Sequence, residues 1–247
     1  MTKEPDLGPP TQVTSPAQAG RPLDRYILPA ATLAALGEIQ GKLVDQCYKQ
    51  RSPASSFRWH GSLRRWVETD LANARIRSAM WGYFDVDAAR RRGYHYAKPE
   101  PDLEGNKIGP ISDSQAGDCF QQSQTAMPLG NGWDGLVGVA PFRDTPSPAS
   151  DSRFFAAVGT WSNCMKVKGF STSDPVQLLS DPRWNTPAPT PEEIATATAD
   201  VDCKIETNLV GVAVAVLKAH DDEYIANHLT ELNAFGPMID KFIRDHQ

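Results

Sequence analysis

The chain has 247 residues, 40% of them hydrophobic and 22% charged, which suits one large globular domain or two small ones. Its net charge of −5 argues against a general nucleic-acid-binding surface, because such a surface needs a basic excess to displace counterions. The longest apolar run, 209–217, is less than half of the roughly 20 residues that cross a bilayer, so no membrane span is predicted.

Residues 1–22 are rich in Pro, Thr, Ser and Gly and contain no apolar run of the kind that a signal peptide needs. Such a segment buries too little surface to order itself, so it is predicted to be a disordered tail or stalk that folding does not need. It is also typical of the stalk that remains when a leader or lipid-anchor segment is removed. A cytoplasmic protein with a flexible N-terminal tail is the alternative. The rest, 23–247, is predicted to be a single helical domain stabilised by disulfides.

Apolar residues at helical spacing predict a mainly α fold organised on a long C-terminal helix. In chain order, the expected elements are helices over 30–47, 63–80, 85–93, 119–127, 146–168 and 190–234, with a short strand over 136–140. Between them, 94–117 has little periodicity and predicts a long exposed loop, which is the expected place for function. If 136–140 and the valine-rich 209–217 were both strands, the fold would be α+β instead.

The long C-terminal helix carries the clearest start signal. Thr190, Pro191 and Glu193 supply an N-cap, a first-turn proline and the glutamate of a capping box. Apolar residues then share one face, and 209–217 is apolar all round, which predicts that it crosses the centre of the core. The Gly236-Pro237 pair is expected to end the helix near residue 234.

The four cysteines are dispersed and contain no C-x-x-C pair, so the close-set ligands typical of structural zinc are missing. Such a set suits two disulfides in an exported protein, and four buried thiols in a cytosolic protein are the alternative. If the helix ending near residue 168 packs antiparallel to the long helix, Cys164 can meet Cys203. That leaves Cys47 for Cys119. This pairing is favoured, and the other two pairings remain open.

Residues 57–66 combine aromatic and basic side chains, which can stack on a ligand or hold an anion. The candidate ligand-binding residues are Trp59, His60, Arg64, Trp66 and, from the following loop, His95. The alternative is that two tryptophans pack the start of a helix while the arginines reach solvent. Three arginines at 90–92 present the same choice between an anion site and a solvated helix end.

No catalytic, metal or cofactor motif is present. The chain contains no G-x-S-x-G, H-E-x-x-H, Walker loop or G-x-G-x-x-G, so no cofactor is predicted. The densest group of potential ligands is His220, Asp221, Glu223 and His228, but His220, Glu223 and His228 do not all share one face of a helix. No metal site is therefore predicted.

A set of short motifs runs from about residue 23 to the end, with the strongest between 155 and 235. They are Trp161-Ser-Asn-Cys164-Met165 with Gly169 behind it, Asp181-Pro182-Arg183-Trp184, Pro191-Glu-Glu-Ile, Ala199-Asp200-Val-Asp-Cys203-Lys204, Thr207-Asn208-Leu-Val-Gly211, Arg92-Gly93-Tyr94 and Gly117-Asp-Cys119. As a set they resemble a family of actinobacterial exported proteins, many of them lipoproteins. The family is mostly uncharacterised, so the resemblance implies export and paired cysteines but no reaction. This chain departs from the pattern because its first residues are not a leader.

Three functions from different classes follow. The leading hypothesis is a non-enzymatic protein of the cell envelope or exterior that binds a small molecule or an envelope protein. The second is an enzyme, either a tailoring enzyme or a hydrolase, in which His60 or His95 works with loop carboxylates such as Asp102 or Glu104. The third is an accessory subunit of an export system. A pocket lined by Trp59, His60, Arg64 and the 94–117 loop would support a ligand site, whereas a flat apolar patch would indicate a partner.

Overall fold

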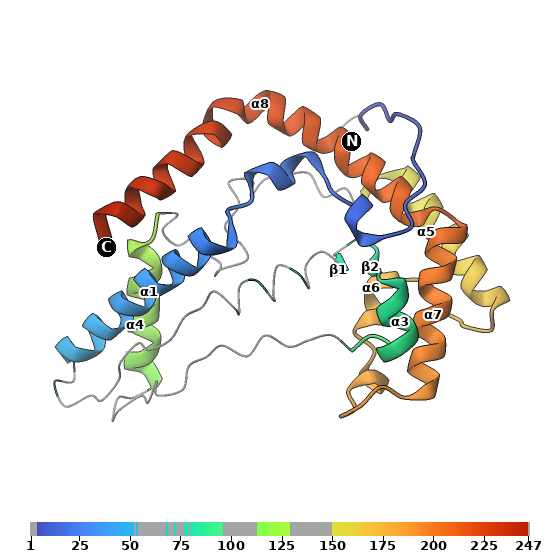
Figure 1. Cartoon of the computed structure of the whole chain (residues 1–247), viewed down its shortest axis with the longest axis horizontal. Helices are drawn as coiled ribbons and strands as arrows, with labels where there is room; N and C mark the ends of the chain where they lie inside the picture. Colours follow the sequence, from blue (N-terminus) through green and yellow to red (C-terminus); the bar gives the residue numbers. More distant parts are fainter. Residues whose placement is uncertain are drawn as a thin grey trace. The chain divides into compact units, whose positions relative to one another are not determined.

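The computed structural model describes residues 4–51, 53, 68, 72, 77–78, 80–95, 113–128 and 150–246. The chain divides into two compact units. Unit 1 contains 1–25, 72–97 and 142–228, and unit 2 contains 26–71, 98–141 and 229–247. The predicted mainly α fold is confirmed (Figure 1). The strands of the described residues, β1 (Arg77–Ser78) and β2 (Gly82–Tyr83), form one short antiparallel pair.

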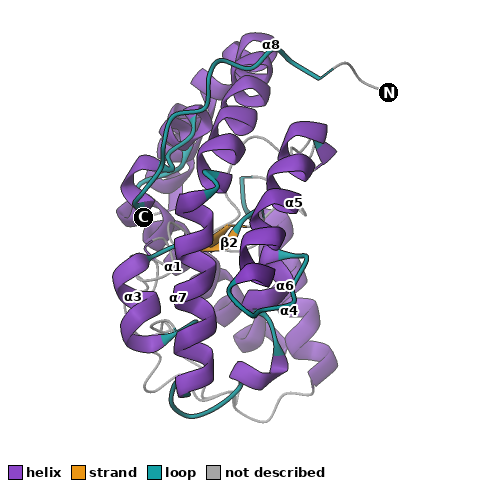
Figure 2. Cartoon of the chain, turned by 90° about the vertical axis from the view of Figure 1, so that its right-hand side faces the viewer, coloured by secondary structure: helices purple, strands orange, loops and turns teal. Residues whose placement is uncertain are grey.

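Unit 1 is built mainly from short helices and part of one long helix. They are η1 (Pro16–Gln18), η2 (Pro22–Tyr26), α3 (Val86–Arg92), α5 (Ser152–Val167), α6 (Pro175–Leu179), η5 (Pro182–Trp184), α7 (Pro191–Glu206) and the first part of α8 (Leu209–His246). In Figure 2, α3 lies beside α7, with α5 and α6 close by. The core of this unit contains Trp161 and Met165 of α5, Val201 of α7 and the start of α8. The 209–217 run is thus a buried helix and not a strand.

Aspartates start four of these helices, as their side-chain chemistry predicts. Asp85, Asp151, Asp174 and Asp181 each accept a hydrogen bond from a backbone N–H of the first turn. At the other end of α5, Gly169 has a φ of 91° and the N–H of Phe170 donates to the carbonyl of Met165, which is a Schellman ending. Local sequence therefore sets most helix boundaries in unit 1.

The predicted long C-terminal helix is wrong in one respect, because it is two helices. Thr190 and Glu193 form the expected capping box, but α7 ends at Glu206. Asn208 has a φ of 53°, the left-handed conformation that asparagine tolerates, and its N–H donates to the carbonyl of Ile205. Its side chain is also used, since it accepts from the N–H of Val13 and donates to the carbonyl of Thr11. The N-terminal segment thus helps to break the helix.

The predicted stop at Gly236-Pro237 is also wrong. Helix α8 continues through Pro237 to His246. Proline removes one backbone donor and its ring crowds the carbonyl four residues earlier, and the burial of apolar residues on either side of it offsets this cost. Phe235 and Ile239 are buried in unit 2 against α1. The backbone of α8 instead leaves helical geometry at His228, with φ −123° and ψ 19°, and the boundary between the two units falls there.

Unit 2 pairs α1 (Ala30–Arg51) with α4 (Asp113–Ala126). The predicted apolar face of α1 is confirmed, since Leu33, Leu36 and Ile39 are buried. Cys47 near the end of α1 is bonded to Cys119 of α4, with Cα atoms 5.6 Å apart. None of the described helices is both long enough and apolar enough to cross a bilayer.

Both predicted disulfides are present. Besides Cys47–Cys119, Cys164 of α5 is bonded to Cys203 of α7, and their Cα atoms are 5.7 Å apart. All four cysteines are therefore paired. One covalent link lies in each unit, where it joins two packed helices.

The N-terminal segment differs from the predicted disordered stalk, because residues 4–22 pack on unit 1. Val13 is buried in its core, and Arg21 forms a two-pronged ion pair with the buried carboxylate of Asp221. The segment also approaches α8 closely: a Cβ added to Gly211 would lie 2.2 Å from the carbonyl oxygen of Thr11. Composition misses these contacts because each of them is with a residue near the other end of the chain.

Deleting residues 1–22 should therefore destabilise unit 1. The deletion removes Arg21 and leaves Asp221, which is 1% exposed, without its guanidinium partner. Breaking such a pair costs on the order of 3 kcal/mol, so the midpoint of urea unfolding should fall. In an Asp221→Asn background the same deletion should cost clearly less, because no charge is then left unpaired. An unchanged midpoint would show that the segment is not packed.

Asp151 should give the protein an acid-sensitive contribution to stability. Hydrogen bonds from Arg153, whose side chain pairs with Asp151, lower the pKa of this carboxyl to about 2. Because the folded value is depressed, the contribution is present above the unfolded value of about 3.9 and is lost as the pH falls from there through the folded value of about 2. Asn is almost as good an N-cap, so Asp151→Asn removes the charge alone. Wild type should be about 2 kcal/mol more stable than the variant at pH 6, and the difference should be mostly lost at pH 2 and absent at about pH 1. A constant difference would contradict this.

Candidate binding site

The centre of unit 1 contains an ion pair with no exposure to solvent. Asp200 and Lys204, one turn apart on α7, are both 0% exposed, and Lys204 Nζ lies 2.7 Å from Asp200 Oδ2. Lys204 Nζ also donates to the carbonyl of Tyr83 at 2.8 Å. Asp200 accepts two further hydrogen bonds, from Trp161 Nε1 at 3.0 Å and from the hydroxyl of Tyr94 at 3.3 Å. Three segments of the chain thus meet at one carboxylate.

Burial controls the protonation of this cluster. It raises the pKa of the Asp200 carboxyl and lowers the pKa of the Lys204 ammonium, and in each case the opposite charge of the partner counteracts the shift. The pKa of the Tyr94 hydroxyl is raised by burial and by the adjacent Asp200. Because these groups are sealed from solvent and bonded to each other, the cluster holds α5, α7 and β2 together and has no open position for a substrate.

A second buried carboxylate ties the segment after α3 to the start of α7. Glu193, 0% exposed, closes the capping box, accepts from the N–H of Tyr94 and forms a hydrogen bond with Nδ1 of His95, both at 2.8 Å. Gly93 permits this approach, since a Cβ there would lie 2.6 Å from Glu193 Oε1. One glutamate therefore serves as a helix cap and as a tertiary contact.

His95 is positioned by both of its ring nitrogens. Nδ1 faces Glu193 Oε1, and Nε2 lies 2.9 Å from the carbonyl oxygen of Thr186. A carbonyl oxygen can only accept, so Nε2 carries hydrogen and offers no lone pair to a substrate. The carboxylate and histidine resemble a general base with its orienting group, but the nitrogen that would do the chemistry is already bonded.

Aromatic rings connect the buried cluster to the surface. The ring of Tyr94 lies 5.9 Å from that of Trp184, and the guanidinium of Arg183 lies 4.6 Å above the Trp184 ring. Arg183 bonds to Asp181 on one side and to Glu192 on the other. This hydrogen bonding lowers the pKa of Asp181 and raises that of Arg183. Arg183 is therefore paired with carboxylates on two sides at the surface of unit 1.

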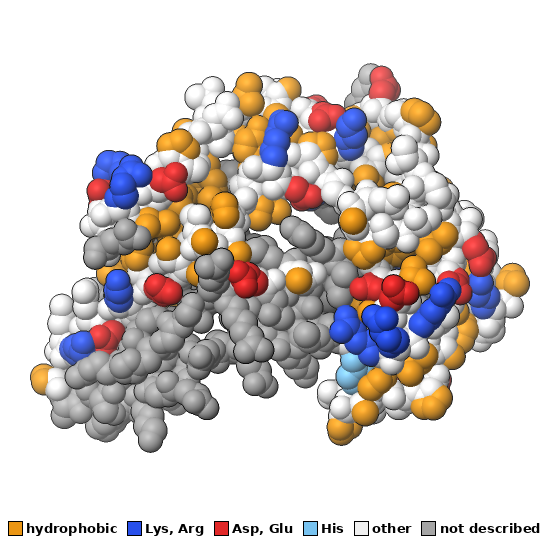
Figure 3. Space-filling model, viewed as in Figure 1, with side chains coloured by type: hydrophobic (Ala, Val, Ile, Leu, Met, Phe, Trp, Pro, Cys, Tyr) orange, Lys and Arg blue, Asp and Glu red, His pale blue; other side chains and the backbone are white. Residues whose placement is uncertain are grey.

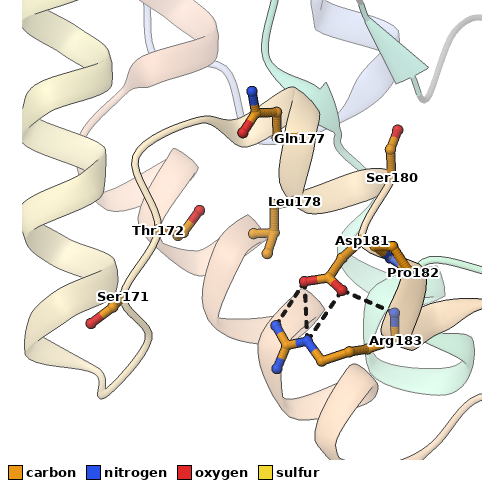
Figure 4. A pocket seen from close by; sticks show the side chains of 8 residues that line it. All are labelled: Ser171, Thr172, Gln177, Leu178, Ser180, Asp181, Pro182 and Arg183. Carbon is orange, nitrogen blue, oxygen red and sulfur yellow. Dashed lines mark hydrogen bonds and ion pairs between the residues drawn. The ribbon is translucent and has the colours of Figure 1, made fainter.

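A shallow hollow of about 420 Å³ opens beside Arg183. Its lining comes from the loop after α5, from α6 and from η5, and consists of Ser171, Thr172, Gln177, Leu178, Ser180, Asp181, Pro182 and Arg183. Figure 4 shows Thr172 facing Leu178, with Asp181 and Arg183 bonded to each other at one edge. Most of its polar side chains are uncharged hydroxyls or an amide. The hollow can accept and donate hydrogen bonds, and its two charged groups already neutralise each other.

Of the ligand-binding residues predicted from sequence, four lie outside the described residues: Trp59, His60, Arg64 and Trp66. The loop carboxylates Asp102 and Glu104 lie outside them as well. His95 is described, and its ring is held by Glu193 and Thr186. The predicted pocket with the 94–117 loop therefore stays a prediction.

Sequence reasoning missed the residues of the buried cluster. Asp200 and Lys204 are spaced one turn apart and lie on the same side of the helix as Ala197 and Val201, which predict a core-facing position. Two charged residues one turn apart within an apolar helix face were therefore the sequence signal that could have identified this cluster. No sequence pattern of this kind predicts the hollow, because the hollow depends on how two loops meet.

The cysteines and one acid form a group with the geometry of metal ligands. The sulfurs of Cys164 and Cys203 and a carboxylate oxygen of Glu206 all lie within 4.8 Å of one another. In the disulfide neither sulfur is a thiolate, the form that binds metal, and Glu206 pairs with Lys168 at 2.7 Å. In its oxidised form this group is therefore a structural link.

Comparison of the chain with protein-family models, with curated proteins and with solved structures finds no match. The resemblance to the actinobacterial exported proteins accordingly stays a prediction from the motifs.

Proposed function

We propose that this chain is a non-enzymatic binding protein of the cell envelope or exterior, and that the hollow on unit 1 takes a neutral, hydrogen-bonding ligand. The chemistry of the side chains that line the hollow supports the proposal. Its lining offers hydroxyls and an amide from Ser171, Thr172, Gln177 and Ser180. The two charged residues of the lining, Asp181 and Arg183, neutralise each other, which favours a neutral ligand over a charged one.

The segments that surround the hollow are held by hydrogen bonds, which favours recognition of a ligand. Asp174 and Asp181 fix the starts of α6 and η5, and the Trp184 indole N–H donates to the carbonyl of Leu178 at 2.9 Å. A preformed site loses little conformational entropy when it binds its ligand. In contrast, Asp200 and Lys204, whose pKa values are shifted by burial, are closed to any substrate. The burial of these two ionisable groups favours a binding function over a catalytic one.

Two features support the compartment. Disulfides form and persist in oxidising compartments, and both cysteine pairs of this chain are bonded. The motifs around Cys164 and Cys203 resemble exported proteins, which agrees with that chemistry. A lipid anchor in the native precursor is part of the proposal and follows from the resemblance alone.

A ligand screen with matched variants tests the proposal. Thermal shift is measured with neutral sugars, polyols and short uncharged peptides, because a ligand that binds the folded state raises its apparent stability. Ser171→Trp and Ser180→Trp place an indole at the lining of the hollow, while Ser173→Trp alters an exposed neighbour that does not line it. We expect the stabilisation by a neutral ligand to be lost in the first two variants and kept in the third.

Other outcomes identify the alternatives. Stabilisation that survives both hollow variants would place recognition elsewhere and overturn this site. Chemical conversion of the bound compound, followed by mass spectrometry, would instead identify an enzyme. Binding only to components of an export machine would indicate the accessory-subunit function.

A further inference from the structure

Cys164, Cys203 and Glu206 place the donor atoms of a zinc site together on unit 1. The two sulfurs and a carboxylate oxygen lie within 4.8 Å of one another, and Cys164 Sγ is 3.4 Å from Glu206 Oε2. With Zn–S bonds of about 2.3 Å and Zn–O bonds of about 2.1 Å, tetrahedral geometry puts two sulfurs about 3.8 Å apart and a sulfur and an oxygen about 3.6 Å apart. The spacing of Cys164 and Glu206 already matches such a site.

The helices that carry the two cysteines are also held together by contacts other than the disulfide. Trp161 of α5 and Asp200 of α7, each three residues before a cysteine, form a hydrogen bond of 3.0 Å. Met165 and Val201, which follow them, are buried in the same core. Reduction breaks the bond between the sulfurs and leaves these contacts in place. The two thiols therefore stay within reach of one metal ion.

The group is open to solvent on one side. Cys203 is buried, Cys164 is half-buried, and the Glu206 side chain is 56% exposed. The ammonium of Lys168 lies 2.7 Å from Glu206 Oε1, so a cation already occupies the outer side of this carboxylate. Figure 3 shows acidic and basic side chains next to one another on the surface of unit 1 over α3 and α7 as well. Exposed ion pairs contribute little to stability, so a divalent ion can displace Lys168.

The second disulfide lacks these features. Cys47 and Cys119 are 5% and 0% exposed, and Cys47 Sγ lies 3.4 Å from the amide oxygen of Gln122, which is neutral. Within the part of the chain that the structure describes, no carboxylate or imidazole completes a three-ligand group with these two sulfurs. The chain thus contains its own control, a cysteine pair without a third ligand.

We propose that the reduced protein binds a zinc ion through Cys164, Cys203 and Glu206, with water in the fourth position. Thiolate sulfur selects zinc over hard cations such as magnesium. A dithiol supplies the two electrons and two protons that convert the disulfide into two thiols, and is itself oxidised to a disulfide. The ion then forms two Zn–S bonds, and the two thiol protons leave to solvent.

The ion and the disulfide exclude each other because they use the same two sulfurs. The reverse exchange, with a disulfide as the oxidant, restores the Cys164–Cys203 bond and releases the ion. The redox state of unit 1 therefore controls metal binding. The site is separate from the neutral hollow and does not rest on the proposed function.

Titration of the reduced full chain with Co²⁺ tests the site, after removal of the reductant and under an inert atmosphere. Tetrahedral Co²⁺ bound to thiolates absorbs in the near ultraviolet and the visible. We expect one Co²⁺ per reduced chain, displaced by Zn²⁺ and not by Mg²⁺, and none in the oxidised protein. The Cys164→Ser/Cys203→Ser variant keeps Cys47 and Cys119 and should not give this absorption.

Two further variants should change the affinity in opposite directions. The loss of an outer partner of a metal ligand costs about 10–100-fold, so the loss of the ligand charge in Glu206→Gln should weaken Co²⁺ binding at least about 10-fold. Lys168→Met removes the competing ammonium and should tighten binding by up to about 5-fold, the equivalent of an exposed ion pair. Glu192→Gln alters another exposed glutamate of α7 and is the matched control, with an expected change of less than about 2-fold.

Alkylation of the reduced protein locates the ion. Zn²⁺ should slow the modification of Cys164 and Cys203, measured by peptide mass spectrometry, and leave the rates at Cys47 and Cys119 unchanged. Equal protection of all four cysteines would mean binding to an unfolded chain. That result would overturn the site, and so would an unchanged affinity in Glu206→Gln. Both leave the neutral hollow untouched.

Discussion

Lys204→Met is expected to lower the free energy of unfolding by about 3–5 kcal/mol, the range measured when one partner of a buried ion pair is removed. The substitution leaves the carboxylate of Asp200, 0% exposed, with only Trp161 and Tyr94 as donors. The backbone carbonyl of Tyr83 also loses its hydrogen bond from Lys204. Chemical denaturation measures this loss.

Two controls show whether the pair or the side chain is responsible. Combining Asp200→Asn with Lys204→Met removes both charges and should recover at least about 1 kcal/mol relative to Lys204→Met alone. Lys241→Met removes the lysine of an exposed Lys–Asp pair one turn apart on α8, and should leave the melting temperature unchanged. Equal effects at positions 204 and 241 would contradict a buried, paired Lys204.

Replacement of Cys164 and Cys203 by serine should cost up to about 4 kcal/mol, because the closed loop spans 39 residues and its loss frees the unfolded chain. The link between Cys47 and Cys119 spans 72 residues and should be worth about as much. Thermal melting of both serine pairs, with and without a reductant, measures these contributions. Reductant should lower the melting temperature of wild type and hardly affect a variant that lacks both links.

The position of each bond adds a sharper test. Cys164 and Cys203 join helices of unit 1, and Cys47 and Cys119 join helices of unit 2. Hydrogen exchange in the Cys164→Ser/Cys203→Ser variant should therefore accelerate first in α5 and α7. Acceleration confined to α1 and α4 would contradict the assignment of that link to unit 1.

The parts of the fold predicted from sequence are those set by neighbouring residues. The capping box of Thr190 and Glu193, the aspartate caps and the apolar face of α1 all follow from side chains within a few positions of one another. The disulfide pairing was predicted because helix order limits which cysteines can meet. The break at Asn208 was missed, since apolar periodicity continues through it and its stabilising partners lie in residues 11–13.

The same reason limits prediction of the site. Asp200 accepts hydrogen bonds from Tyr94 and Trp161, which lie 106 and 39 residues away along the chain. No local sequence pattern therefore predicts the cluster. Residues 4–22 look like a disordered stalk by composition, yet Arg21 pairs with Asp221 across 200 residues. The hollow arises where the loop after α5 meets η5, and a sequence pattern does not show how two loops meet.

Mapping the cysteine pairing in protein taken from its native cells tests the exported, disulfide-stabilised protein most directly. Free thiols are alkylated before lysis, and non-reducing peptides are then identified by mass spectrometry. We expect linked peptides for Cys47–Cys119 and Cys164–Cys203 and no alkylated cysteine. Alkylation at all four positions would show a reducing compartment and contradict export.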